Sequence, residues 1–179
     1  MKSVNRLNTC CFIGGCIRNS MFLFEEKTPH FNDIKSKVQE SAVYLIEKLS
    51  VKNFVSGMDI GFEQFAAETI LELKERYPQI TLEGVLPHEM HSINWSTDQR
   101  KKYYSIMEKS DREVLLQYHY TDDCMRKRNL YMINKSKHII FFKDGTGSID
   151  SLILFTKAKG RNVIVIDSGR ITSMNKMIY

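Results

Sequence analysis

Short apolar runs alternate with amphipathic stretches along this chain, and this alternation constrains the fold more than any other feature of the sequence. The run at 163–166 contains only Val and Ile, which is typical of a strand covered on both faces. We expect strands at residues 9–13, 53–56, 80–86, 114–117, 139–142 and 163–166. Strands separated by helices predict a mostly parallel sheet with helices on both faces, which is a Rossmann-like three-layer α/β/α fold.

The segments between these runs carry helix signals. Residues 62–77 have their apolar side chains at i, i+3/i+4 spacing, and Pro78 ends that helix. Ser96 and Gln99 are spaced as a capping box at the start of another helix. We expect helices at 31–49, 62–77, 96–109, 123–135 and 149–159.

Length and composition indicate one globular domain. A chain of 179 residues with 42% hydrophobic and 26% charged residues has enough apolar surface for its own core. We therefore expect a single domain over 1–179, with a core at about 9–167 and a short tail after Gly169. The four cysteines do not indicate a disulfide framework, and Cys10 and Cys11 fit buried thiols on opposite faces of a strand.

No apolar run is long enough to span a membrane, so we expect no membrane partner. The apolar stretch before Cys16 is too short for a secretion signal, so a cytoplasmic location is expected. The net charge of +5 favours an anionic partner, but it does not choose between a nucleotide, a nucleic acid and a phosphorylated metabolite.

Ligands of an open parallel sheet bind outside the carboxyl ends of its strands, so the loops after the strands are the candidate site. In the first of these loops, Gly14 and Gly15 would let backbone amides approach a phosphate, and Arg18 would add a planar donor. The glycines are also explained by a tight turn alone.

The loop after the second strand contains Ser56, Gly57 and Gly61, followed by Glu63 in the first turn of a helix. Glu63 either compensates the helix dipole or accepts hydrogen bonds from sugar hydroxyls. The spacing of these glycines is neither the dinucleotide fingerprint nor a P-loop.

Two later loops complete the candidate site. In one, Tyr120 offers a ring for stacking, while Arg128 and Asn129 share a helix face and offer hydrogen-bond donors. A salt bridge covering its stem would equally explain Arg128. The other loop, at a helix N-terminus, offers amides and hydroxyls to a phosphate through Gly145, Thr146, Gly147 and Ser148.

No metal site or cofactor is expected. His88 and His91 lie three residues apart in a loop, which is not the spacing of a histidine pair that binds zinc from a helix.

Several short motifs, taken together, support a family resemblance. They are Thr9-Cys10-Cys11-Phe12, Gly57-Met58 with Gly61, Ala66-Ala67-Glu68, Asn94-Trp95-Ser96, Tyr103-Tyr104, and Tyr120-Thr121 with Cys124-Met125 and Lys127-Arg128-Asn129. With these motifs the chain resembles the YpsA/YoqJ-like branch of the SLOG superfamily, the Rossmann-like group that also includes the Smf/DprA and LOG proteins.

The resemblance implies a pocket for a nucleotide or a nucleotide derivative over the sheet. Some members of the superfamily sense ADP-ribose-type signals, LOG enzymes hydrolyse the N-glycosidic bond of nucleoside monophosphates, and DprA proteins bind single-stranded DNA. Ser151 stands where the LOG motif has its glutamate. The first loop also departs from the usual Thr-Gly-His-Arg.

The leading hypothesis is therefore a protein that senses or sequesters a small nucleotide-derived ligand of the ADP-ribose or NAD type. One alternative is a nucleotide N-glycosidase that uses Glu63 or Glu68 as its carboxylate. Another is single-stranded nucleic-acid binding through the run Arg126-Lys127-Arg128, although this run lacks interleaved aromatic residues. An exposed apolar helix face would allow a homo-oligomer.

Overall fold

The computed structural model describes residues 5–14, 31–145 and 147–167, and within them six strands form one parallel sheet. The strand order is β4-β3-β2-β1-β5-β6, so the chain builds outward from β1 to β4 and then crosses back to place β5 on the free side of β1. The strands are β1 (Thr9–Gly14), β2 (Asn53–Ser56), β3 (Thr81–Leu86), β4 (Arg112–Leu115), β5 (His138–Lys143) and β6 (Asn162–Asp167).

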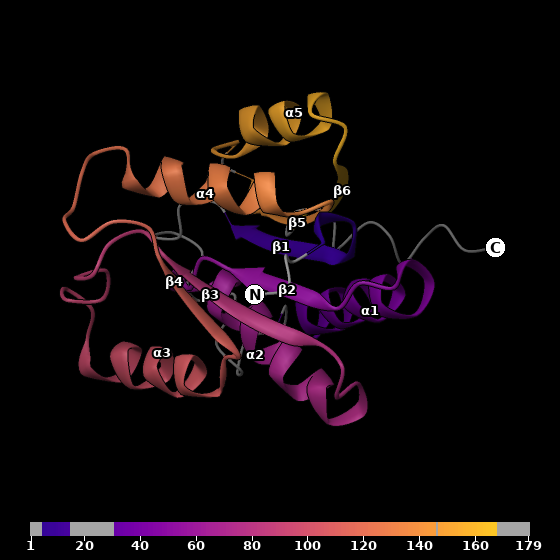
Figure 1. Ribbon diagram of the computed structural model, residues 1–179, viewed down its shortest axis with the longest axis horizontal. Coiled ribbons are helices and arrows are strands. Elements are labelled where there is room, and N and C mark those ends of the chain that lie inside the picture. Colours follow the sequence, from indigo (N-terminus) through magenta and orange to yellow (C-terminus); the bar gives the residue numbers. More distant parts are fainter. Residues whose placement is uncertain (1–4, 15–30, 146, 168–179) are drawn as a thin grey trace.

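Helices cover both faces of the sheet, which confirms the three-layer α/β/α prediction (Figure 1). Three helices lie on one face: α1 (Phe31–Leu49), α2 (Phe62–Arg76) and α3 (Thr97–Lys109). Two lie on the other: α4 (Cys124–Lys135) and α5 (Asp150–Ala158). A short 3₁₀ turn, Arg6–Asn8, precedes β1.

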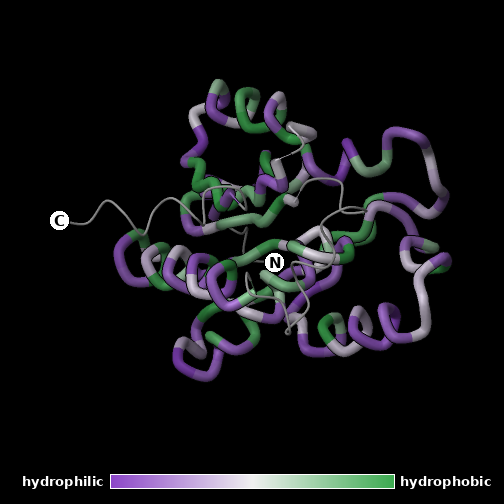
Figure 2. The backbone as a smooth tube through the Cα atoms, turned by 180° about the vertical axis from the view of Figure 1, so that it is seen from behind, coloured by the Kyte–Doolittle hydropathy of each residue, from purple (hydrophilic) through white to green (hydrophobic). Residues whose placement is uncertain are grey.

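The central strand β1 is buried on both faces and separates two apolar cores. Cys10 and Phe12 belong to the core under α1 and α2, whereas Cys11 and Ile13 belong to the core under α4 and α5. In Figure 2 the strands at the centre are mostly hydrophobic, whereas most of the helices around them carry many hydrophilic residues. The prediction of buried thiols is confirmed, and burial raises the pKa of Cys11 to about 12.

Most element boundaries agree with the sequence pattern, and the Ser96–Gln99 capping box is present. The fourth strand was predicted wrongly at 114–117, because β4 starts at Arg112 and pairs with β3 from Glu83 to Leu86. Arg112 and Glu113 are exposed at this edge of the sheet, so they do not extend the apolar run on which the prediction depended. The tail expected after Gly169 lies outside the described residues.

None of the described helices combines the length and the apolar character that a membrane span requires.

Candidate functional site

The strand order reverses between β1 and β5, and in sheets of this type ligands bind outside the carboxyl ends of the strands beside that switch. Gly14 ends β1 opposite Phe142 of β5. The predicted loop that follows β1 and the predicted loop that follows β5 therefore both start at this switch. The β2–α2 loop starts one strand away, because β2 is the other neighbour of β1.

The β2–α2 loop is held by its own side chains. The Ser56 hydroxyl is buried; it donates to the Glu63 backbone oxygen over 2.8 Å and accepts from the Met58 amide over 3.2 Å. Met58 has a φ of 58°, a left-handed conformation that costs a non-glycine residue free energy and that concentrates at functional sites. Gly61, with a φ of 96°, is the N-cap of α2. Ser56 therefore positions this loop.

Glu63 is a buried carboxylate at the point where β1, β2 and α4 meet. It accepts from the Gly14 amide over 3.4 Å, from the Asp59 amide over 3.2 Å and from Arg128 Nη2 over 3.3 Å. Burial raises the pKa of Glu63, and the Asp59 charge adds to this effect, while Arg128 and the two amides lower it. The three hydrogen-bond donors therefore stabilise the charged form of Glu63 against the cost of its desolvation.

Arg128 reaches this carboxylate from α4 and is itself only 3% exposed. Its Nη1 donates to the Gly57 backbone oxygen over 3.1 Å and lies 3.6 Å from Asp59 Oδ2, and its Nη2 donates to Asn129 Oδ1 over 3.2 Å. We call Asp59, Glu63 and Arg128 the charge cluster.

Gly57 is required by the packing of this cluster. A Cβ atom at residue 57 would lie 2.5 Å from Glu63 Oε2 and 2.7 Å from Arg128 Cζ. The structure therefore brings together five of the residues predicted from sequence, namely Gly14, Gly57, Glu63, Arg128 and Asn129.

His91, in the β3–α3 loop, also lies at the charge cluster, and it was not among the site residues predicted from sequence. Its pKa is lowered to about 4, first by burial and then by the Arg128 and His88 charges; Asp59 and the Met58 backbone act in the opposite direction. Its Nε2 atom is buried without a hydrogen-bond partner. The one sequence signal for this residue was its position after a strand end.

The protonation state of His91 is expected to change the fluorescence of Trp95, the only tryptophan of the chain. The ring centroids of the two residues lie 4.8 Å apart. Protonated imidazole quenches indole fluorescence more strongly than neutral imidazole. An acid titration of Trp95 emission should therefore show a midpoint near pH 4, the value to which the His91 pKa is lowered. The variant His91→Gln should lack this transition. A midpoint near the ordinary histidine pKa of about 6.5 would contradict the burial of His91 at the cluster.

The lowered pKa of His91 also makes the free energy of unfolding depend on pH. Because the folded-state pKa of His91 lies below the unfolded value, the stability that neutral His91 confers is present above about pH 6.5 and is lost as the pH falls through about 4. The raised pKa of Glu63 acts with the opposite sign, since its contribution is present below its unfolded pKa and is lost as the pH rises through the folded one. The difference between wild type and His91→Gln isolates the first contribution.

The β4–α4 loop carries Tyr120, which is 64% exposed and packs its ring edge-on against His88. Arg126 and Lys127 are exposed and pair with Asp123. Because Arg128 points inward to Glu63 instead, the run Arg126-Lys127-Arg128 does not form one basic surface, and that premise of the nucleic-acid alternative is wrong.

The β5–α5 loop lies on the other side of the switch. Gly145 and Gly147 both have positive φ, and Ser148 is exposed. Lys143, at the end of β5, forms an ion pair of 2.9 Å with Asp150 in the first turn of α5. Three predicted site residues, Gly15, Arg18 and Thr146, lie outside the described residues.

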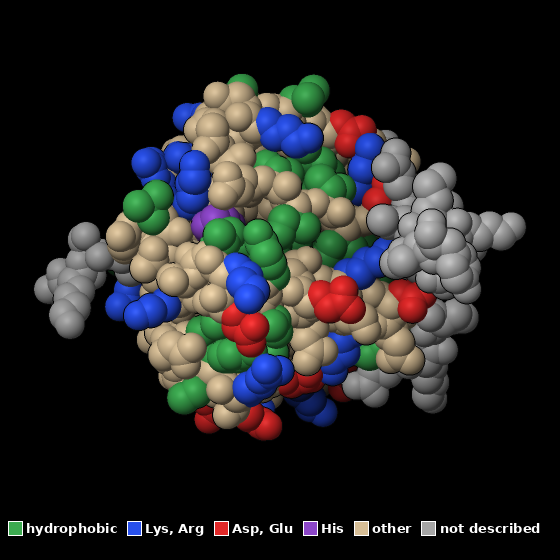
Figure 3. Space-filling model, turned by 90° about the vertical axis from the view of Figure 1, so that its right-hand side faces the viewer, with side chains coloured by type: hydrophobic (Ala, Val, Ile, Leu, Met, Phe, Trp, Pro, Cys, Tyr) green, Lys and Arg blue, Asp and Glu red, His purple; other side chains and the backbone are tan. Residues whose placement is uncertain are grey.

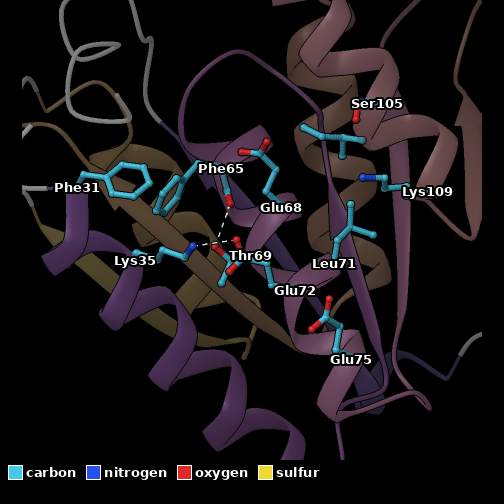
Figure 4. A pocket seen from close by; sticks show the side chains of 11 residues that line it. Phe31, Lys35, Phe65, Glu68, Thr69, Leu71, Glu72, Glu75, Ser105 and Lys109 are labelled. Carbon is cyan, nitrogen blue, oxygen red and sulfur yellow. Dashed lines mark hydrogen bonds and ion pairs between the residues drawn. The ribbon is translucent and has the colours of Figure 1, made fainter. Parts of the chain in front are cut away.

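A separate hollow of about 480 Å³ lies between α1, α2 and α3 (Figure 4). Phe31 and Phe65 form one end of it, and Lys35 pairs with Glu72 over 2.8 Å inside it. All of its lining residues lie on helices and none on a loop that follows a strand, so we do not assign it to the site at the sheet edge.

On the side of the molecule seen in Figure 3, Lys and Arg side chains lie among Asp and Glu over the centre and the right, whereas those at the upper left have no Asp or Glu side chain beside them. Within the described part of the chain, no group of three or more His, Cys, Asp or Glu residues could hold a metal ion.

Comparisons with known proteins agree with this architecture. A family model described as the YspA SLOG family, named YpsA, matches residues 11–162. A UPF0398 protein of Brevibacillus brevis is 30% identical over 100 residues, which are 56% of this chain and 53% of that protein. The SPbeta prophage-derived protein YoqJ of Bacillus subtilis is 28% identical over 134 residues, 68% of this chain and 78% of that protein.

The chain matches about half the length of the first of these curated relatives. Among solved structures, DNA processing protein A from Helicobacter pylori, described for its binding of single-stranded DNA, superposes with a TM-score of 0.58 and 18% identity. The superposition covers 92% of this chain and 67% of that one, and at this identity it shows a shared fold only. Because the family model covers most of the sequence, the chain belongs to the YpsA family of SLOG proteins.

Proposed function

We propose that this protein binds a nucleotide-derived anion of the ADP-ribose or NAD type at the carboxyl edge of its sheet, and thereby senses or sequesters it. The observation that supports this most is Arg128, a guanidinium that is buried and held in one orientation beside the strand-order switch. A fixed planar donor of this kind suits a phosphate, because less side-chain freedom is lost when the anion binds.

In this proposal the phosphates bind where several donors converge. The Gly14 amide and Arg128 both donate to one carboxylate oxygen, Glu63 Oε1, so a phosphate would bind beside this oxygen and share these donors with it. The amides around Gly145 and Gly147 would serve a second phosphate on the β5 side of the switch. Glu63 would exchange one of its donors for a ribose hydroxyl.

Binding without cleavage is favoured by how the carboxylates are used. Hydrolysis of an N-glycosidic bond requires a carboxylate free to stabilise an oxocarbenium-like centre. Glu63 already accepts three hydrogen bonds, and Glu68 pairs with Lys102 at a distance of 2.7 Å. Glu68 also lines the separate hollow shown in Figure 4.

Calorimetric titration with ADP-ribose, NAD and AMP tests the proposal, and binding of at least one of them is expected. Chromatography of the ligand after long incubation should recover it intact, and release of the free base would establish the glycosidase alternative. Failure of all three ligands to bind would overturn the proposal.

Asp59→Asn offers a sharper test, because Asp59 competes with an anionic ligand for Arg128. Its carboxylate lies 3.6 Å from Arg128 Nη1 and is 32% exposed, so removing the charge while keeping the shape should strengthen anion binding. We expect an affinity increase of about two- to fivefold, the range of a partly exposed ion pair. A decrease in affinity would show that the anion does not bind at Arg128.

A further inference from the structure

A row of aromatic and imidazole rings runs along the carboxyl edge of β3 and β4, beside the charge cluster. Tyr120 contacts His88 with ring centroids 5.5 Å apart, His88 contacts His91 at 6.0 Å, and His91 contacts Trp95 at 4.8 Å. All three contacts are edge-to-face. The row connects an exposed tyrosine to the half-buried His91, which interacts electrostatically with Asp59 and Arg128.

A shallow cavity of about 560 Å³, open to solvent, lies between the β3–α3 and β4–α4 loops, and its lining residues include the chain neighbours of His88 and Tyr120. The residues lining it are Glu89, Gln117, Tyr118, His119 and Thr121. Its walls are fixed, because the Glu89 amide donates to the Tyr118 backbone oxygen over 3.3 Å and the Gln117 side-chain amide donates to Thr121 Oγ1 over 2.9 Å. Tyr118 nevertheless keeps 70% of its surface exposed.

Two polar atoms in the ring row are not satisfied. His88 Nδ1 and His91 Nε2 are both buried and lack hydrogen-bond partners, which is costly for ring nitrogens that can donate or accept. Neither of these two histidines lines the cavity, so the polar groups open to a nucleobase there include the side chains of Glu89, Gln117 and Thr121, which offer both donors and acceptors. Exposed tyrosine rings beside it supply the apolar stacking surface that such a base needs.

The distance to the proposed phosphate subsite also fits a nucleotide. The cavity lies at the ends of β3 and β4, whereas Gly14 ends β1, and the strand order places β2 between β1 and β3. Arg128, however, donates to Gly57 directly after β2, and two strand spacings of about 4.8 Å separate β2 from β4, a span of about 10 Å that one nucleotide can bridge from phosphate to base. A nucleotide lying across the carboxyl ends would therefore place its base near Tyr118 and Tyr120 when its phosphate is at Arg128.

We propose that the cavity and ring row at Tyr118, Tyr120 and His88 form the nucleobase subsite of this protein. This inference rests on the proposed function and adds to it the part of the ligand that gives specificity. The phosphate end binds at the charge cluster, and the base lies against the two tyrosines at the opposite end of the same edge.

AMP and ribose 5-phosphate test this assignment, because they differ only in the base. Wild-type protein should bind AMP about fivefold or more tightly than ribose 5-phosphate, the lower end of what one stacked base contributes. Tyr118→Ala and Tyr120→Ala should each reduce this difference and leave the affinity for ribose 5-phosphate unchanged. Both side chains are exposed, so the variants should fold, which circular dichroism will verify. Tyr44→Ala, at another exposed tyrosine, on α1, is the matched control and should bind both ligands like wild type.

Three results would overturn the base subsite: equal binding of AMP and ribose 5-phosphate by wild type, an unchanged preference in both tyrosine variants, or a loss of affinity for both ligands alike. Each of these results leaves the proposed function standing if ADP-ribose still binds to wild type. Failure of every nucleotide to bind would overturn both.

Discussion

Replacing Arg128 by methionine is expected to lower the free energy of unfolding by about 3–5 kcal/mol, because it leaves the buried Glu63 carboxylate without its charged partner. Both side chains are almost fully buried, at 3% and 2% exposed, so the unpaired carboxylate would lie in a low-dielectric environment. Methionine keeps much of the volume of the arginine stem, so the loss measures the charge and not a cavity. Urea denaturation followed by circular dichroism gives this free energy.

The double variant Glu63→Gln/Arg128→Met separates the charge effect from packing. It should recover a large part of the loss, since a neutral amide is much less costly to bury than an unpaired carboxylate. Arg126→Met, two residues away and exposed, is the matched control and should change stability by less than about 0.5 kcal/mol. The single variant Glu63→Gln completes the comparison. If the losses of stability in Arg128→Met and Glu63→Gln simply add in the double variant, the pairing of Glu63 with Arg128 is refuted.

Gly57→Ala should weaken nucleotide binding strongly by moving the same pair of side chains. The new Cβ would lie 2.5 Å from Glu63 Oε2 and 2.7 Å from Arg128 Cζ, so the guanidinium must leave its present position. We expect the affinity for ADP-ribose to fall about tenfold or more, because one charge-assisted hydrogen bond contributes about 1.5–3 kcal/mol. Stability should fall by about 1–3 kcal/mol, as for other overpacked sites.

Gly160→Ala is the control for Gly57→Ala. Gly160 has a φ of 67° and open space around its Cβ position, so alanine there strains the backbone without touching the site. It should lower stability and leave the affinity for ADP-ribose unchanged. Normal ADP-ribose binding by Gly57→Ala would exclude Arg128 as a phosphate ligand.

The sequence was sufficient to predict where the loops of the site lie, because the rule that places ligands at carboxyl strand ends depends only on strand positions and direction. It predicted the positions of Gly57, directly after β2, and of Glu63, in the first turn of α2. It did not reveal that Arg128 donates to Glu63, since 65 residues separate the two and only the folded sheet and α4 bring them together. A salt bridge was one of two explanations for Arg128, and the structure shows that ion pair.

His91 shows a second limit of the sequence pattern. Histidines are usually assigned by spacing to one another, and the spacing to His88 pointed away from metal binding. What matters for His91 is its distance to Asp59 and Trp95, which the sequence does not encode locally. The polar start of β4 was missed for a related reason, because an exposed edge strand need not be apolar.

The position of β1 in the sheet has a consequence for how the chain is made. A ribosome releases β1 first and can let it pair with β2 at once, but the strand that completes its other side, β5, begins only at His138. Until then β1 presents an open row of backbone donors and acceptors, the kind of edge that promotes aggregation. Nascent chains stopped before His138 should therefore depend on chaperones far more than the finished protein does.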